Sequence, residues 1–333
     1  MDLNTLWFAL IAILFAGYFV LEGFDFGVGI LLPVLGKDDR QRRILINTVG
    51  PHWDGNEVWL ITAGGAIFAA FSGWYATLFS GFYLPLFLIL VAIIFRGVAF
   101  EFRSKDESRG WRNFWDWAIC IGSFIPALLW GVAFANFVIG VPIDEGHLYV
   151  GGFWNLLNPY ALVGGIVSLL AFITQGAIFL TLKTTGSIAD EAGKISRRIF
   201  PFLLAAVILL VVLSVVLVHF SLLASIIASL VVLLLLLNGW LMRKNKDGWG
   251  FIIHSVAILA AVAAVFAQLY PNVMVSNLNP AWNLTIYNSS SSPYTLQTMS
   301  IIALVFVPIV LAYQAWSYWL FKKRITEKSS LEY

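Results

Sequence analysis

Residues 6–35 read LWFALIAILFAGYFVLEGFDFGVGILLPVL, an apolar run whose only charged side chains are Glu22 and Asp25. A helix needs about 20 apolar residues to cross the roughly 30 Å hydrocarbon core of a bilayer, and this run is longer than that. The whole chain has the same character, because 60% of its 333 residues are hydrophobic and only 11% are charged. A soluble domain carries about 25% charged residues. The composition therefore excludes a soluble protein and predicts one embedded in lipid.

Apolar segments of this kind recur along the chain, and they predict an all-α polytopic membrane protein with about nine transmembrane helices. Helices are required because lipid offers no hydrogen-bond partner to an exposed backbone N–H or C=O group. The connections are too short to form soluble domains, so we expect residues 1–333 to make a single integral membrane domain. The predicted spans are residues 6–35, 56–73, 79–101, 114–138, 157–182, 198–219, 221–242, 249–271 and 296–321.

The basic residues predict the orientation of these spans. Nineteen of the 20 lysines and arginines fall in alternate connections and in the C-terminal segment, all on one side of the predicted membrane. The positive-inside rule makes that side cytoplasmic. The N-terminus is then expected outside and the C-terminus in the cytoplasm.

The composition also limits what the chain binds. A net charge of +2 is too small to suggest nucleic-acid binding. Cys120 is the single cysteine, which excludes a disulfide framework and a cysteine-rich metal site. Haem needs an axial ligand at membrane depth, whereas the histidines fall in an external loop or near the membrane surfaces and are expected to form interfacial hydrogen bonds. They are His52, His147, His219 and His254. We therefore expect no cofactor held by the ligands of this chain alone.

Arg96 is the one basic residue inside a predicted span, in LVAIIFRGV at residues 90–98. A charge at the membrane centre costs at least about 2.5–3.5 kcal/mol, so Arg96 is expected to be paired and to face protein or water. The candidate partners are Glu22 and Asp25, which are three residues apart and project from one helical face. The alternative is that Arg96 extends its long side chain to the inner interface.

A second polar group lies in PHWDGNEVW at residues 51–59, at the inner mouth of the second span. Asp54, followed three residues later by Glu57, fits a helix N-cap with its capping-box partner. A carboxylate at a membrane entrance can also pass protons. The sequence leaves both roles open for Asp54.

The depth of the polar residues favours proton uptake from one side. The outer half of the predicted membrane is nearly free of ionisable groups, whereas a transporter that opens to both sides places its ion site near the midplane. A one-sided string of carboxylates indicates water and protons that enter from the cytoplasm and stop part-way. The residues in the cytoplasmic half or at its boundary are Glu22, Asp25, Asp54, Glu57, Arg96 and Glu101.

Several motifs go beyond composition, and the chain closely resembles subunit II of the cytochrome bd quinol oxidases. The resemblance covers nearly the whole sequence, with the weakest match in the apolar region 184–255. The motifs that carry it are GFDFGVG at residues 23–29, NTVGPHWDGNEVWLITAGG at 47–65, FSGFY at 79–83, FRGVAFEFRSK at 95–105, WRNFWDW at 111–117, GVAFAN at 131–136, TQGA at 174–177 and VPIVLAY at 307–313.

The resemblance implies a nine-helix fold of two four-helix bundles plus one peripheral helix, packed against a pseudo-symmetric subunit I. In such oxidases subunit I binds two haems b, one haem d and the quinol. Electrons from quinol reduce O₂ to water, with protons drawn from the cytoplasm, and subunit II supplies no haem ligand. A small third single-span subunit is common. A structural quinone or lipid in this subunit would also fit, and the complex would lie in a bacterial cytoplasmic membrane.

The resemblance also implies roles for particular residues. Asp54 would lie on a proton path toward the haems, while Asp25 and Arg96 would belong to the polar interior. Trp59 would neighbour an oxygen access route. Glu22 and Glu57 join these residues as candidates for a proton pathway or a buried polar network, and no residue of this chain is expected to be catalytic by itself.

Two other functions fit parts of the sequence. The first is a secondary ion-coupled transporter, which the buried charges would support but for which no inverted repeat is found. The second is a purely structural scaffold subunit, in which the acids serve only as caps and packing pairs.

Overall fold

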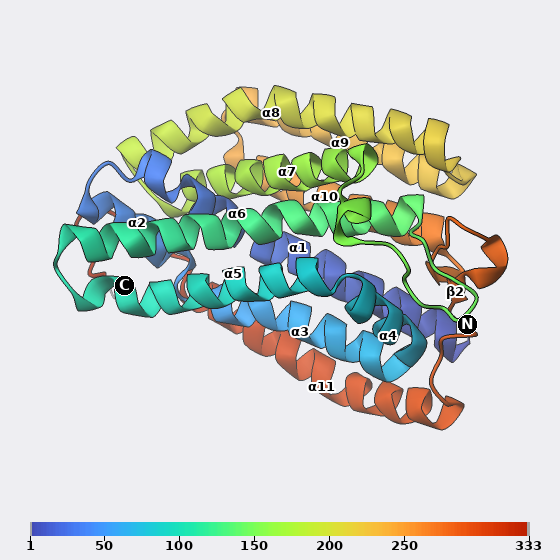
Figure 1. Ribbon diagram of the computed structural model, residues 1–333. Coiled ribbons are helices and arrows are strands. Elements are labelled where there is room, and N and C mark those ends of the chain that lie inside the picture. The colour runs from blue at the N-terminus through green and yellow to red at the C-terminus, as the bar shows by residue number, and fades with distance from the viewer. Residues whose placement is uncertain (1, 332–333) are drawn as a thin grey trace.

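The computed structural model describes residues 2–331 and is almost entirely helical (Figure 1). The α-helices are α1 (Leu3–Leu35), α2 (Asp39–Val49), α3 (Trp53–Ala70), α4 (Ser72–Gly81), α5 (Tyr83–Phe102), α6 (Arg109–Ile139), α7 (Pro159–Lys183), α8 (Ser187–Leu213), α9 (Leu222–Arg243), α10 (Asp247–Leu269) and α11 (Pro293–Leu320). Two short strands, β1 (Asn272–Met274) and β2 (Leu284–Thr285), pair antiparallel. Four short helical turns are η1 (Arg103–Lys105), η2 (Phe153–Leu157), η3 (Ser214–Val218) and η4 (Pro280–Trp282).

Eight helices within residues 2–331 are long and apolar enough to cross a membrane. They are α1, α5 with η1, α6, α7, α8 with η3, α9, α10 and α11. This confirms the prediction of an all-α polytopic membrane protein. The predicted second span corresponds to α3, which is not among the eight. Its first two turns contain Asp54 and Glu57, and these lower its hydropathy.

The structure differs from the predicted spans at α2, α4, α5 and α8. Helices α2 and α4 occupy stretches where no separate helix was expected, and α5 begins at Tyr83 rather than at residue 79. The sixth span starts 11 residues earlier than predicted, because α8 begins at Ser187 and not at residue 198. Hydropathy detects only the part of a helix that is apolar throughout. The first turns of α8 carry Lys194 and Arg197, so the helix continues beyond the apolar segment.

The basic loops gather at one end of the molecule. Figure 1 shows α2 and the C-terminal segment together at that end, while the N-terminus and β2 lie at the opposite end. We call the first the basic end. There Arg40 donates to the backbone carbonyls of Glu327 and Ser329, and Arg43 donates to that of Leu331. The C-terminal segment is therefore folded back against α2.

The long helices form two groups with α1 between them. Helices α3 and α6 pack against α1 on one side, with α5 packed on α6. Helices α7, α8, α9 and α10 pack together on the other side, with α7 and α10 also against α1. Helix α11 lies outside both groups along α1 and α3 (Figure 1). Leu296 is its only fully buried residue. Most of α11 therefore presents its apolar side chains outward.

The closest helix crossing is made by glycines on α1 and α7. A Cβ atom added to Gly27 would lie 2.0 Å from the carbonyl oxygen of Phe172 and 2.8 Å from the Cα of Gly176. A Cβ atom added to Gly176 would lie 2.5 Å from the carbonyl carbon of Gly27. Small residues allow this approach in membrane helices, where van der Waals packing replaces the hydrophobic effect as the driving force. The crossing holds α1 in the centre of the molecule.

This crossing predicts the effect of a single methyl group. Gly176→Ala should destabilise the protein by about 1–3 kcal/mol or more, because α1 and α7 must move apart to admit the new Cβ. The matched control is Gly110→Ala at the start of α6, where nothing lies within 4 Å of an added Cβ. Thermal unfolding in detergent measures both variants. Equal stability of Gly176→Ala and Gly110→Ala would contradict the close packing described here.

Candidate functional site

Arg96 of α5 is fully buried and paired with carboxylates from two other helices. Its Nη2 atom contacts Oε1 of Glu22 on α1 and lies 3.1 Å from Oε1 of Glu57 on α3. The guanidinium carbon lies 4.8 Å from the centre of the Phe26 ring, which adds a cation–π contact. The predicted pairing with Glu22 is therefore present, and the alternative in which Arg96 extends to the interface is wrong. Glu57 is a partner that the sequence did not suggest.

Asp25 does not pair directly with Arg96 and is instead held by an amide. Its Oδ2 atom accepts a hydrogen bond of 2.8 Å from Nδ2 of Asn56 on α3. The oxygen of that amide, Asn56 Oδ1, accepts from two side chains of α11, Gln314 at 3.2 Å and Tyr318 at 2.8 Å. Asp25 is thus linked through one asparagine to the peripheral helix. Sequence analysis did not single out Asn56, Gln314 or Tyr318, because none of them is charged.

These side chains form one buried polar cluster between α1, α3 and α5, which we call the Arg96 cluster. It consists of Glu22, Asp25, Asn56, Glu57 and Arg96. Two carboxylate oxygens in it, Oε2 of Glu22 and Oδ1 of Asp25, are buried and have no hydrogen-bond partner within residues 2–331. Buried polar atoms normally have a partner in the protein or in ordered water. Nε and Nη1 of Arg96 are also buried without a partner, so all four atoms can bind water, but only the two oxygens can accept a proton.

The capping box predicted for Asp54 and Glu57 is not formed. The residue before α3 is His52, which makes no side-chain cap, and Asp54 is already the second residue of the helix. Asp54 Oδ1 accepts only from the backbone N–H of Gly55, at 2.7 Å. Glu57 turns away from the helix start because Arg96 offers it a charge-assisted hydrogen bond, which is roughly twice as strong as a neutral one. Asp54 remains exposed at the basic end of α3.

His52 lies just before α3, buried against the end of α11. Its ring stacks on that of Tyr318 with centroids 4.2 Å apart and an angle of 3° between the planes. Burial, together with the positive charge of Lys183, lowers the pKa of His52 to about 4. The ring is therefore neutral at physiological pH and serves as a flat packing surface.

Two of the histidines are engaged by other groups of the protein. Both ring nitrogens of His254 are engaged, Nδ1 with Asn238 at 2.9 Å and Nε2 with the carbonyl oxygen of Ala171 at 3.0 Å. His147 Nδ1 contacts the carbonyl oxygen of Trp282. No group of three or more His, Cys, Asp or Glu side chains in residues 2–331 could hold a metal ion.

A second buried ion cluster lies at the basic end. Arg103 is buried, with its Nε atom 2.5 Å from Asp116 of α6 and its Nη2 atom 2.9 Å from Asp39 of α2. Arg42 of α2 also binds Asp116, at 2.7 Å. Sequence analysis missed this cluster because its arginines counted only as basic loop residues. It ties α2 to the η1 turn and to α6.

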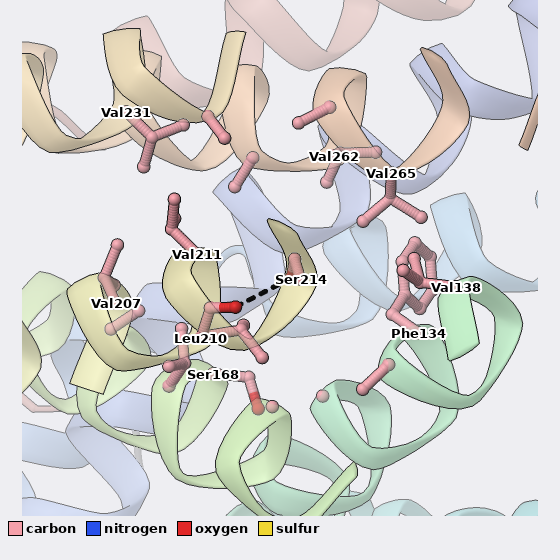
Figure 2. A pocket seen from close by; sticks show the side chains of 18 of the residues that line it. Phe134, Val138, Ser168, Val207, Leu210, Val211, Ser214, Val231, Val262 and Val265 are labelled. Atoms are coloured by element: carbon pink, nitrogen blue, oxygen red, sulfur yellow. Dashed lines mark hydrogen bonds between the residues drawn. The ribbon is translucent and has the colours of Figure 1, made fainter. Parts of the chain in front are cut away.

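An apolar cavity of about 180 Å³ lies between α6, α7, α8, α9 and α10. Figure 2 shows Val207, Leu210 and Val211 of α8 facing Val231 of α9 and Val262 of α10 across it. Its polar contribution is small, from Ser168 and from a hydrogen bond between Tyr160 and Ser214 at the η3 turn. Such a lining suits an apolar chain and not an ion.

Comparison with known proteins places this geometry in a family. The family model described as cytochrome bd terminal oxidase subunit II matches residues 3–321. The chain belongs to this family. As a bd oxidase subunit II it is part of a respiratory oxidoreductase complex that contains haem and a partner subunit I. The resemblance inferred from the sequence motifs is thereby confirmed.

The relatives of this bd oxidase subunit II match along their whole length. Cytochrome bd ubiquinol oxidase subunit 2 of Bacillus subtilis (strain 168) is 43% identical, covering 100% of this chain and 99% of the relative. Cytochrome bd-I ubiquinol oxidase subunit 2 of Escherichia coli (strain K12) is 40% identical, covering 98% and 96%. A chain in the structure of bd oxidase from Geobacillus thermodenitrificans has the same fold, with a TM-score of 0.76 at 17% identity and coverage of 96% and 99%.

The pairing of Arg96 predicts a strong effect of its removal. Arg96→Ala should destabilise the assembled complex by about 3–5 kcal/mol, because it leaves buried carboxylates without a cation. Arg96→Lys should be milder, because both carboxylates contact the single Nη2 atom and an ammonium keeps the positive charge. Haem content per oxidase and thermal unfolding report the effect. Wild-type stability of Arg96→Ala would show that the pairs contribute nothing.

The depressed pKa of His52 predicts an acid sensitivity. The stability from burying the neutral ring is fully present above the unfolded-state pKa of 6.5 and is lost as the pH falls toward about 4. The full difference corresponds to about 3 kcal/mol. His52→Phe keeps a ring against Tyr318 and cannot become charged, so its unfolding temperature should fall less between pH 7 and pH 5. Identical pH dependence in the two proteins would contradict this assignment.

Proposed function

We propose that this subunit supports quinol oxidation and the reduction of O₂ to water at a haem-bearing subunit I, and that the Arg96 cluster carries protons inward from the cytoplasm. The observation that supports this most is the imbalance of charge in the cluster. It holds three carboxyl groups and one guanidinium, all largely buried. In a medium of low dielectric, a proton bound to a carboxyl group is the remaining way to balance that charge.

The path begins at Asp54 in this proposal. Asp54 is exposed at the basic end, and Glu57 follows it by three residues on the same helix, so both lie on one face. Glu57 contacts Arg96, which in turn contacts Glu22. The carboxyl groups bind and release protons, whereas Arg96 stays charged and holds them in place. The free oxygens of Glu22 and Asp25 form the inner end of the route.

The proposed topology has nine spans, with the basic end in the cytoplasm of a bacterial cell and the whole of residues 1–333 in one membrane domain. Helix α3 is the ninth span. Its 18 residues correspond to about 27 Å at 1.5 Å per residue, close to the thickness of the hydrocarbon core. The basic end is assigned to the cytoplasm because lysine and arginine concentrate in cytoplasmic loops.

The partner subunit I would contain two haems b, one haem d and the quinol site, in line with the relatives named as ubiquinol oxidase subunits. We place its contact on the α3 side of the molecule. Gly65 of α3 lies on the outer surface, and nothing lies within 4 Å of an added Cβ. At a helix position without a packing partner, a glycine only destabilises the helix. A close partner helix explains such a residue. Trp59, on the same helix, would border the oxygen access route.

Two further associations complete the proposal. The apolar cavity between α6, α7, α8, α9 and α10 would accept a lipid chain or the tail of a structural quinone, because its lining is almost wholly hydrocarbon. A small single-span third subunit would cover part of the outward apolar surface. A transporter function is not favoured, since the cluster occupies only the half of the bundle nearest the basic end. A purely structural role remains the alternative outcome of the experiment below.

The test is a set of substitutions at Asp54. Asp54→Asn keeps the size of the side chain and cannot exchange a proton near neutral pH, while Asp54→Glu can. We expect Asp54→Asn to assemble with its haems but to lose at least about 80% of quinol-driven O₂ uptake, since one relay group contributes about 10²–10⁴-fold in proton transfer. Asp54→Glu should retain a substantial part. The measurement is O₂ uptake per haem d in membranes, with haem content determined separately.

The matched control is Asp190→Asn. Asp190 is an exposed acid in the first turn of α8, also at the basic end, and its side chain makes no hydrogen bond or ion pair with residues 2–331. Both substitutions remove the same favourable interaction with a helix dipole, which amounts to about 0.3–1 kcal/mol. Asp190→Asn should leave activity unchanged. Full activity in both variants would show that Asp54 has a structural role only.

A further inference from the structure

We propose that Gln314 of α11 and Asn56 of α3 are positioning residues for Asp25, and that they reserve its Oδ1 atom for the transported proton. This proposal rests on the proton pathway proposed above and names the atom at which its inner acid works. It is carried by a chain of hydrogen bonds that runs from Trp59 through these two amides to Asp25.

The series of hydrogen bonds has a fixed donor-to-acceptor direction because it starts at the indole of Trp59. The Trp59 Nε1–H group donates to Oε1 of Gln314 at 2.7 Å. An indole nitrogen can only donate a hydrogen bond. The group of Gln314 that faces Trp59 must therefore be its carbonyl oxygen, and its NH₂ group must point the other way. Trp59 thus removes the ambiguity that usually attends the orientation of a glutamine amide.

The orientation of Gln314 then determines that of Asn56. The Gln314 NH₂ group lies 3.2 Å from Oδ1 of Asn56, and the Tyr318 hydroxyl lies 2.8 Å from the same oxygen. Two donors from α11 converge on one acceptor. The NH₂ group of Asn56 is consequently directed at α1, where it donates to Oδ2 of Asp25 at 2.8 Å and to the carbonyl oxygen of Leu21 at 3.2 Å.

The two oxygens of Asp25 are therefore unequal. Oδ2 already accepts a hydrogen bond from the NH₂ group of Asn56. A proton on Oδ2 would bring an O–H hydrogen close to that N–H hydrogen, with no acceptor between them. Oδ1 is buried and has no partner within residues 2–331. A proton arriving at Asp25 is accordingly held on Oδ1. Amides and an indole do not release protons near neutral pH. The hydrogen bonds from α11 therefore orient Asp25 and do not themselves conduct protons.

The surroundings of Asp25 allow this arrangement to be tested without changing any charge. The titratable groups near Asp25 are Glu22 on α1, Glu57 on α3, Arg96 on α5 and Tyr318 on α11. Replacing Gln314 by Met and Tyr318 by Phe removes both donors to Asn56 and leaves the three charged residues in place. The Phe ring can still stack on His52.

The experiment uses the assembled oxidase in membranes. In the double variant Gln314→Met/Tyr318→Phe the amide of Asn56 is free to turn, so Asp25 loses a fixed donor to its charged form. We expect the pH profile of O₂ uptake per haem d to move to higher pH by about half a unit or more. We also expect the infrared carboxyl band that disappears in Asp25→Asn to change frequency.

The control is Gln297→Met/Tyr313→Phe, which makes the same two chemical changes on α11 at exposed positions away from the cluster. It should keep the wild-type profile and band. If the first double variant fails to assemble, Asn56→Ala removes the donor to Asp25 directly and should produce the same two shifts. A purely structural tie between α11 and α3 would lower the amount of assembled oxidase but would move neither the profile nor the band.

The outcomes separate this inference from the proton pathway itself. Full activity in Asp25→Asn would remove Asp25 from the pathway. A slow Asp25→Asn together with a wild-type pH profile and band in the double variant, or in Asn56→Ala, would overturn the positioning role of Gln314 and Asn56 and leave the pathway intact.

Discussion

The buried positive charge of Arg96 is the constraint on which the rest of the structure depends. A guanidinium without exposed surface must have its charge balanced by groups in contact with it. The balancing carboxylates come from α1 and α3, so three helices must each turn one particular face toward the same point. In a bundle whose other contacts are almost all between hydrocarbon side chains, this is the interaction that fixes helix rotation. Packing alone would tolerate several rotations of nearly equal energy.

The glycine crossing of α1 with α7 has a complementary part in the fold. It sets how close the helices lie, whereas the charges set how they are rotated. Gly27 belongs to the same helix as Glu22 and Asp25, so close packing and polar contact are built into one segment. The segment that sequence analysis found most informative is therefore the one that makes the most specific contacts. Its unusual mixture of acids and glycines reflects both requirements.

The sequence predicts well the features that depend on neighbouring residues. It predicts less well the contacts between residues that are far apart in the sequence. Apolar runs are long because lipid is thick, so the long apolar helices can be found from the sequence. The pairing of Arg96 with Glu22 was also predictable, because a deep charge has few possible partners. The link from Glu57 to Arg96 was not, since the local pattern around Asp54 fits a capping box equally well. The neutral side chains Asn56 and Gln314 give no signal at all until α11 is placed beside α3.

Helix α11 follows the other long helices within residues 2–331, and this has a consequence for biosynthesis. Domains form from the N-terminus as the chain leaves the ribosome, and α1 to α10 already contain the buried core, because Leu296 is the one buried residue that α11 adds. The body can therefore pack before α11 is made. The side chains that orient the Asn56 amide arrive only with α11, so Asp25 receives its finished surroundings after the helices around it have packed. A product that lacks α11 would keep this packed body and would still lack the contacts that set the geometry of its interior.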